Sequence, residues 1–199
     1  MLTKSKFEVP SWDYIYNLLI DLSERIKRSS FKPDVIVGVS RGGWHPARIL
    51  SDLLENSNIA NIKVEFYSDI YETVSKPVIT QPISVPIEDK TILIVDDVSD
   101  TGKTLELIYK EFSKQAKEVK TITIYCKPWT CFKPDFHAKS TDRWIIFPWE
   151  RFEMIKMIGT NMMKEGKKLG EVIEELIKSG LDPVIVKKFT SEIFGKERL

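Results

Sequence analysis

Residues 92–105 have the sequence ILIVDDVSDTGKTL, and this stretch decides the fold. Its first four residues are apolar and mostly β-branched, which is typical of a strand buried on both faces of a parallel sheet. The apolar positions that follow, Leu105, Leu107, Ile108 and Phe112, have helical spacing. The stretch therefore predicts a strand, a loop and a helix, with the loop at the carboxyl end of the strand.

The predicted loop carries the chemistry of a phosphorylated sugar site. Gly102 lets the backbone approach a ligand closely, and the free N–H groups at the start of the helix favour an anion. Thr101 and Thr104 add hydroxyl donors. Asp96 and Asp97 can accept hydrogen bonds from sugar hydroxyls or hold a hard divalent cation through oxygen.

A second glycine-rich turn follows an earlier strand. The run 34–39 after Pro33 predicts a buried strand, and residues 44–54 predict a helix. Between them lie Ser40-Arg41-Gly42-Gly43, where the glycines expose backbone N–H groups and Arg41 offers a planar fork for phosphate oxygens. Alone, this motif also fits an ordinary tight turn with a solvated arginine.

Residues 92–105 resemble the phosphoribosyl pyrophosphate (PRPP) signature of type I phosphoribosyltransferases. The competing interpretation is a generic strand, turn and helix with solvated carboxylates. The resemblance implies that the departing pyrophosphate is bound by Ser40, Arg41, Gly42 and Gly43. It also implies a non-proline cis peptide at Arg41–Gly42. It assigns PRPP and its 5-phosphate to Asp96, Asp97, Asp100, Thr101, Gly102, Lys103 and Thr104.

Within this group the resemblance assigns separate tasks to the three carboxylates. Asp96 and Asp97 would hold the ribose diol or Mg²⁺, with Asp97 as the metal ligand. Asp100 would be the catalytic residue, facing N7 of the base, where a carboxylate can manage a proton. The structural alternative for Asp100 is a helix N-cap, and the two roles are compatible.

Lys127-Pro128 and the run Trp144-Ile-Ile-Phe-Pro-Trp-Glu resemble the xanthine-guanine branch of the family, over roughly residues 33–150. By this resemblance Lys127 donates to O6 of a purine, Trp144 stacks on the ring, and Ile145 contacts the 2-position edge through its backbone. An ammonium suits a carbonyl oxygen, and an indole face suits any purine ring. The alternatives are a surface lysine and a core tryptophan.

Composition places limits on the other functions. The 199-residue chain has a net charge of +1 and no apolar run long enough to span a bilayer, so we expect neither nucleic acid nor membrane as a partner. Cys126 and Cys131 are too few for a disulfide framework, and the polar N-terminus does not resemble a signal peptide. These features predict a cytoplasmic protein.

The rest of the chain predicts helices, strands and one long loop. Ser11 is a plausible N-cap for an amphipathic helix over 11–28, and Gly180 and Pro183 separate two short C-terminal helices. The Glu-rich face of the first of these argues against DNA binding. Further strands are predicted over 62–67, 119–125 and 143–147, an irregular segment over 129–139, and a loop over 68–89 in the place of the family's closing loop.

The predicted fold is α/β, a parallel sheet of about five strands flanked by helices as in type I phosphoribosyltransferases. Residues 1–150 would form the catalytic core and 151–199 a small helical C-terminal extension. The resemblance implies an Mg-dependent enzyme that acts on PRPP and a purine base to give a purine nucleoside monophosphate and pyrophosphate in purine salvage. A 6-oxopurine is the expected base. Adenine specificity and a non-catalytic PRPP- or nucleotide-binding regulator are the alternatives, and we expect a homo-oligomer, a dimer or tetramer.

Overall fold

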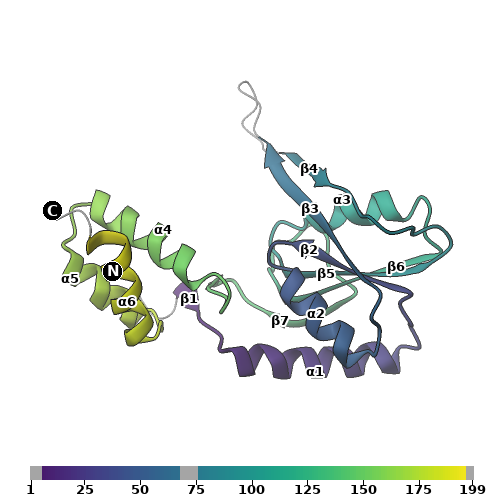
Figure 1. Ribbon diagram of the computed structural model, residues 1–199, viewed down its shortest axis with the longest axis horizontal. Helices are drawn as coiled ribbons and strands as arrows, with labels where there is room; N and C mark the ends of the chain where they lie inside the picture. The colour runs from purple at the N-terminus through teal and green to yellow at the C-terminus, as the bar shows by residue number, and fades with distance from the viewer. Residues whose placement is uncertain (1–5, 68–75, 196–199) are drawn as a thin grey trace. The chain divides into compact units, whose positions relative to one another are not determined.

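The computed structural model describes residues 6–67 and 76–195. Its central feature is a six-stranded sheet in the order β4-β3-β2-β5-β6-β7 (Figure 1). All neighbouring pairs are parallel except β3 and β4. The predicted parallel sheet flanked by helices is confirmed, with an antiparallel edge strand added. The strands are β2 (Val35–Ser40), β3 (Ile59–Tyr67), β4 (Lys76–Gln81), β5 (Thr91–Ser99), β6 (Glu118–Cys126) and β7 (Phe136–Ser140).

Strand β4 lies within the segment for which the sequence predicts an irregular loop, 68–89. The first part of the expected closing loop, residues 68–75, lies outside the described residues. Pro77 of β4 is opposite Phe66 of β3. Because β4 is at the edge of the sheet, Pro77 needs no N–H group for a further strand, and a proline is tolerated there. The loop prediction is therefore wrong for β4.

The strand beside β6 also differs from the prediction. Strand β7 forms within the segment expected to be irregular, and the Asp135 carboxylate just before it accepts hydrogen bonds from the N–H and hydroxyl of Thr121, at 2.8 and 2.9 Å. The predicted strand at 143–147 is reduced to β8 (Trp144–Ile145), which pairs in parallel with β1 (Phe7–Glu8) in a separate two-stranded sheet. Apolar periodicity misses β7 because it is polar and only half-buried.

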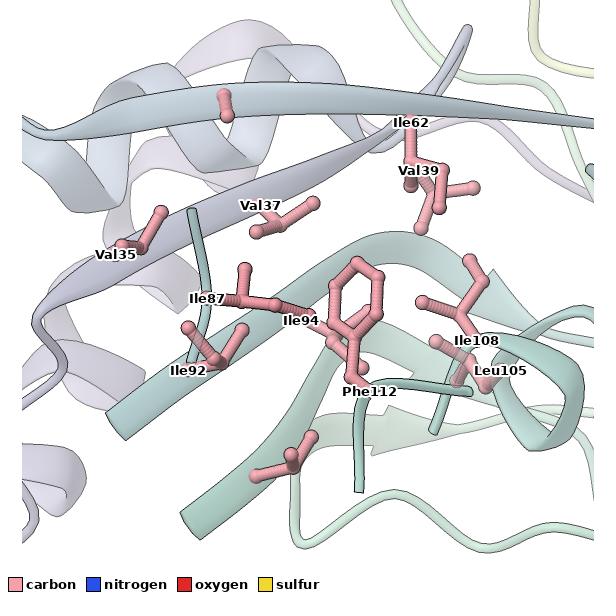
Figure 2. Close-up of a cluster of buried hydrophobic side chains, with 12 residues drawn as sticks. Val35, Val37, Val39, Ile62, Ile87, Ile92, Ile94, Leu105, Ile108 and Phe112 are labelled. Atoms are coloured by element: carbon pink, nitrogen blue, oxygen red, sulfur yellow. The ribbon is translucent and has the colours of Figure 1, made fainter. Parts of the chain in front are cut away.

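Alternate residues of the central strands form an apolar core with α3 (Lys103–Phe112) on one face of the sheet (Figure 2). The register sets Val35 opposite Ile92 and Val37 opposite Ile94, so the side chains on this face lie in matching rows. Helix α3 is thereby anchored over β5, and its N-terminus lies at the carboxyl end of that strand. The cluster includes Val35, Val37, Val39, Ile92, Ile94, Leu105, Ile108 and Phe112.

Two further helices border the sheet. Helix α1 (Trp12–Arg28) begins at the predicted N-cap, because the Ser11 hydroxyl accepts a hydrogen bond from the N–H of Tyr14 at 3.1 Å. Arg25 of α1 donates to the carbonyl oxygen of His137 in β7, at 2.7 Å. Helix α2 (Trp44–Leu53) follows the turn after β2 and packs against β2 and β5.

The C-terminal segment contains the helices α4 (Arg151–Lys164), α5 (Leu169–Lys178) and α6 (Pro183–Phe194), so the helical extension is confirmed. The Asp182 carboxylate caps α6 by accepting hydrogen bonds from the N–H groups of Val184 and Ile185, at 2.8 and 3.0 Å. The helices share an apolar cluster that includes Ile146, Ile155, Val172, Leu176 and Val186, each fully buried.

The described chain divides into two compact units. One runs from Ile15 to Asp142 and holds the six-stranded sheet, while the other joins the described residues up to Tyr14 with those from Arg143 onward. The second unit therefore contains β1 and β8 together with α4, α5 and α6. A compact unit need not be an independently folding domain, so the predicted boundary between residues 150 and 151 stays a prediction.

Candidate active site

The loop after β5 forms a pocket that is large enough for a phosphate group. Its volume is 230 Å³, and Gly102 at its base has a left-handed backbone with φ +83° just before α3 begins. The first turn of α3 contributes N–H groups that have no partner within the helix, which favours an anion. The pocket is lined by Phe66, Asp96, Val98, Ser99, Asp100, Thr101, Gly102, Lys103, Thr104 and Leu105.

The same loop is packed closely against residues 127–132. A Cβ atom added at Gly102 would lie 2.6 Å from the backbone nitrogen of Phe132 and 3.0 Å from its Cβ. The Cys131 N–H donates to the Thr101 carbonyl oxygen at 2.9 Å. The buried Ser99 hydroxyl lies 2.9 Å from the hydroxyl of Thr130. Glycine is therefore required at 102 both by its backbone angle and by the space available.

The turn after β2 meets the loop after β5 at two glycines. A Cβ atom added at Gly42 would overlap the carboxylate of Asp97, and one added at Gly43 would lie 2.8 Å from Cα of Asp96. Arg41 is exposed at this turn, while Gly43 is buried. The structure thus brings the predicted pyrophosphate turn against the predicted ribose carboxylates, which the sequence alone does not show.

The cis peptide of this turn lies one bond earlier than the resemblance implies. The non-proline cis bond joins Ser40 to Arg41, not Arg41 to Gly42. The hydroxyl of Ser40, the last residue of β2, accepts a hydrogen bond from the Asn61 side-chain amide of β3 at 3.3 Å. A sequence motif identifies the turn but does not identify which of its peptide bonds is cis.

Asp96 and Asp97 form a close pair of carboxyl groups at the end of β5. The Asp97 N–H donates to Oδ1 of Asp96 at 2.9 Å. Enclosure by protein raises the pKa of the Asp96 carboxyl well above its usual range, and the neighbouring Asp97 carboxylate raises it further. Negative charge on both carboxyl groups is therefore disfavoured, and a cation or the hydroxyl groups of a sugar would stabilise it.

A metal ion at this pair would need ligands from a substrate as well. Within residues 6–67 and 76–195, no group of three or more His, Cys, Asp or Glu side chains is arranged to hold a metal. Mg²⁺ is commonly bound through one or two carboxylates together with phosphate oxygens and water. The carboxylate oxygens of Asp96 and Asp97 fit that kind of site, and glycine at position 42 leaves space for the Asp97 carboxylate.

Lys127 is connected to the predicted catalytic carboxylate, Asp100, through Trp129. Its backbone N–H donates to the Ser99 carbonyl oxygen at 2.9 Å, and its side chain is buried. Its ammonium lies over the ring of Trp129, 5.4 Å from the centroid, and Nε1 of that ring donates to Oδ1 of Asp100 at 2.8 Å. Trp129 was not predicted as a site residue because it lies in a segment without periodicity. Its position two residues after Lys127 is the one feature of the sequence that could have indicated it.

The other two predicted base-binding residues lie in the second compact unit. Trp144 and Ile145 form β8, where their register partners are Phe7 and Glu8. Trp144 is 55% exposed and Ile145 is buried. The high exposure of Trp144 excludes the core-tryptophan alternative, and its indole is accessible to a ligand. The contact of these residues with a base stays a prediction.

The cysteines differ in their surroundings. Burial raises the pKa of the Cys126 thiol, whereas Cys131 is exposed. Both are free. In the described part of the chain, no helix has the length and apolar character needed to cross a membrane.

Comparison with known proteins agrees with this geometry. Residues 11–152, more than half of the chain, match the model of the phosphoribosyl transferase domain family. A xanthine-guanine phosphoribosyltransferase of Cereibacter sphaeroides is 34% identical over 148 residues, covering 70% of this chain and 84% of that protein. A hypoxanthine-guanine phosphoribosyltransferase of Saccharomyces cerevisiae is 33% identical over 125 residues, covering 54% of this chain and 56% of that protein.

A solved structure gives the same result. The purine phosphoribosyltransferase of Pyrococcus horikoshii Ot3 is 43% identical, with a TM-score of 0.66, and the match covers 72% of this chain and 93% of that one.

Proposed function

The chain belongs to the phosphoribosyl transferase family, and we propose that it transfers ribose 5-phosphate from PRPP to N9 of a 6-oxopurine in purine salvage. Guanine, hypoxanthine and xanthine are the bases of this class. The products are a purine nucleoside 5′-monophosphate and pyrophosphate. The relatives named for xanthine-guanine and hypoxanthine-guanine transfer support this class of base.

One observation carries the proposal: the glycine turn after β2 is packed against the carboxylate pair at the end of β5. A side chain at position 42 would overlap the Asp97 carboxylate, so the two turns lie close enough together to contact one ligand. PRPP has a phosphate at one end of its ribose and a pyrophosphate at the other. In the proposal Ser40, Arg41, Gly42 and Gly43 receive the pyrophosphate, and Asp100, Thr101, Gly102, Lys103 and Thr104 receive the 5-phosphate.

The chemistry at the ribose is a displacement at the anomeric carbon. The bond from C1′ to the pyrophosphate oxygen breaks with its electron pair on the leaving group, and the bond from C1′ to N9 forms. The protein mainly positions the reactants and neutralises charge on the leaving group. Arg41 is exposed at the turn and suited to this charge.

Asp100 takes the proton in the proposed reaction. As N9 attacks, the proton on N7 of the base becomes acidic and passes to the carboxylate. Asp100 is exposed and lines the pocket, so an incoming base can reach it. Asp100 is therefore proposed as the catalytic residue of the chain.

The proposed cofactor is Mg²⁺, with Asp97 as its protein ligand and Asp96 beside it. When bound with PRPP, the ion would supply positive charge to the pyrophosphate oxygens. Asp96 and Asp97 would also accept hydrogen bonds from the ribose diol. The family commonly has this requirement, and the paired carboxylates support it here.

Lys127 is the proposed selector of the base. An ammonium donates to a carbonyl oxygen at position 6 and opposes the amino group of adenine. Its backbone N–H is hydrogen-bonded to Ser99 of the PRPP loop, so in the proposal the base binds beside the reacting ribose. The family resemblance also assigns Trp144 to the base as a stacking surface and Ile145 as a backbone contact, and both assignments are part of the proposal.

The test is to incubate the purified chain with PRPP and Mg²⁺ and each of guanine, hypoxanthine, xanthine and adenine, and to measure nucleotide and pyrophosphate. We expect nucleotide from at least one 6-oxopurine at a far higher rate than from adenine, and no nucleotide without Mg²⁺. Binding of PRPP without nucleotide formation would contradict transfer and favour a regulator. Preference for adenine would contradict the 6-oxopurine class and the assignment of Lys127, but not transfer from PRPP.

Two further parts of the proposal are the oligomeric state and the location in the cell. We propose a homo-oligomer, a dimer or tetramer, in the cytoplasm. Light scattering of the purified chain measures the oligomeric state, and a monomer at working concentration would contradict it.

A further inference from the structure

Trp129 connects the two charged residues that the proposed reaction uses. Its Nε1–H donates to Oδ1 of Asp100 at 2.8 Å, while the ammonium of Lys127 lies 5.4 Å from its ring centroid. An indole has one N–H donor at its edge and a negative π face, so one side chain satisfies both a carboxylate and a cation. No motif used to assign the site includes this residue.

The backbone around Trp129 is fixed to the PRPP loop on both sides. Before it, the Lys127 N–H donates to the Ser99 carbonyl; after it, the Cys131 N–H donates to the Thr101 carbonyl, each at 2.9 Å. Residues 99 and 101 flank Asp100. The indole therefore reaches Asp100 from a segment already attached to its two neighbours.

The exposure of these groups indicates that packing is not the reason for the contact. Trp129 is 56% exposed, so its ring contributes little to the core. Asp100 is exposed as well, and without a donor its carboxylate would be free to rotate toward water. Lys127, in contrast, is only 7% exposed, and the ring of Trp129 lies on its charged end.

We propose that Trp129 is a positioning residue, which holds the Asp100 carboxylate toward N7 of the base through its N–H group and holds the Lys127 ammonium toward O6 through its ring face. This inference rests on the proposed function. With one carboxylate oxygen held by the indole, the other is free to receive the proton. A preorganised base loses less rotational freedom when the substrate arrives.

Two substitutions separate the two contacts. Trp129→Phe keeps an aromatic face for Lys127 and removes the N–H group; we expect kcat for hypoxanthine to fall about 10- to 100-fold, the range for a hydrogen bond to a charged group. The KM for PRPP should stay within about 2-fold, because the 5-phosphate is held by backbone groups. Trp129→Leu should in addition weaken discrimination between hypoxanthine and adenine.

A double-mutant cycle distinguishes positioning from a general structural role. If Trp129 acts through Asp100, then Trp129→Phe should change kcat by less than about 2-fold in a chain that already carries Asp100→Asn. Trp12→Phe is the matched control, since Trp12 is similarly exposed at 48% and is not among the residues assigned to the site. It should leave kcat and KM unchanged.

The outcomes are separable. An unchanged kcat in Trp129→Phe would overturn the inference, as would an equal fall in kcat in the wild-type and Asp100→Asn backgrounds. Thermal unfolding of each variant identifies a folding defect, and a loss of kcat that follows a loss of folded protein would also overturn it. A wild-type chain that forms no nucleotide would overturn the proposed function itself, and this is measured before any variant is compared.

Discussion

The two strand-turn-helix units at the candidate site, β2 with α2 and β5 with α3, follow one design but hold their turns in different ways. The turn after β2 is shaped by close approach, because Gly42 and Gly43 lie against the carboxylate pair and the backbone of β5. The turn after β5 is shaped by a left-handed glycine and by hydrogen bonds to residues 127–132.

The difference shows that glycine meets two separate requirements in the same local pattern. At Gly42 the backbone does not have positive φ, and what excludes a side chain is the neighbouring carboxylate. At Gly102 the backbone has φ +83° and space is short as well. The shape of the β5 turn therefore depends on the backbone of Gly102 and on the segment after β6. The shape of the β2 turn depends on the position of Asp97.

The largest effect is expected at the reacting end of the β5 turn. Asp100→Asn keeps the shape of the side chain but removes its ability to accept a proton, so turnover should fall about 100- to 10,000-fold. PRPP affinity should change much less, because the amide disturbs neither Gly102 nor the first turn of α3. Steady-state kinetics and PRPP titration measure the two quantities. Near-normal turnover would remove Asp100 from the catalytic role.

The close approach after β2 is tested by Gly42→Ala. The added methyl group must displace the Asp97 carboxylate, and a displacement of about 1 Å at a reacting centre can cost about 100-fold in rate. We expect kcat/KM for PRPP to fall by that order while the fold is retained, as measured by kinetics and circular dichroism.

Gly170→Ala in α5 is the matched control, because nothing lies within 4 Å of a Cβ atom added there. It should leave activity unchanged and raise the free energy of unfolding by about 0.4 to 1 kcal/mol, because alanine restricts the unfolded chain more than glycine does. Equal activity of Gly42→Ala and the wild type would show that the two turns do not act together.

Selection of the base is tested at Lys127, whose backbone is hydrogen-bonded to Ser99 at the start of the β5 turn. Adenine would place its amino group against the Lys127 ammonium, leaving buried donors unpaired at about 1 to 3 kcal/mol. Lys127→Ala should therefore reduce the preference for hypoxanthine over adenine about 5- to 100-fold, with little change in the KM for PRPP. Competition between the four purines measures this. An unchanged preference would assign the selection of the base to other residues.

The smallest effect is expected at the far ends of the two units, where Asp34 precedes β2 and Thr91 begins β5. The Asp34 carboxylate accepts hydrogen bonds from the Thr91 N–H at 2.7 Å and its hydroxyl at 2.8 Å. The Thr91 N–H first, and then its hydroxyl, lower the pKa of Asp34 below its usual value. The stabilisation is therefore present above the unfolded-state pKa and is lost as pH falls through the lowered folded-state value.

Asp34→Asn should lower the free energy of unfolding near pH 7 by about 1 kcal/mol, a figure reduced for the exposure of the carboxylate. The difference from the wild type should shrink below about pH 4, near the usual pKa of aspartate. Denaturant unfolding at several pH values measures it. Glu88→Gln, at an exposed turn, is the control and should show no comparable effect. A difference that is constant from pH 3 to 7 would contradict the linkage.

Local pattern was enough to predict the central elements of this protein. The β-branched runs of β2 and β5, the helical spacing after Thr104 and the Ser11 cap depend on residues close in sequence, and the structure has each of them. The same holds for Gly180 and Pro183, which separate α5 from α6. Strands β4 and β7 were missed because edge strands bury little apolar surface, so that their pairing partners rather than their own periodicity define them.

What tertiary structure alone decided is which predicted residues meet. Gly42 and Asp97 are far apart in sequence, and only the neighbouring positions of β2 and β5 in the sheet bring them into contact. Trp129 reaches Asp100 because β6 lies beside β5, so that the segment after one strand covers the turn after the other. Likewise β8 joins β1 in a sheet of its own, and Ile146, just after β8, packs with the C-terminal helices. A single sequence specifies the chemistry at the end of each strand, but the order of strands in the sheet depends on contacts between distant residues.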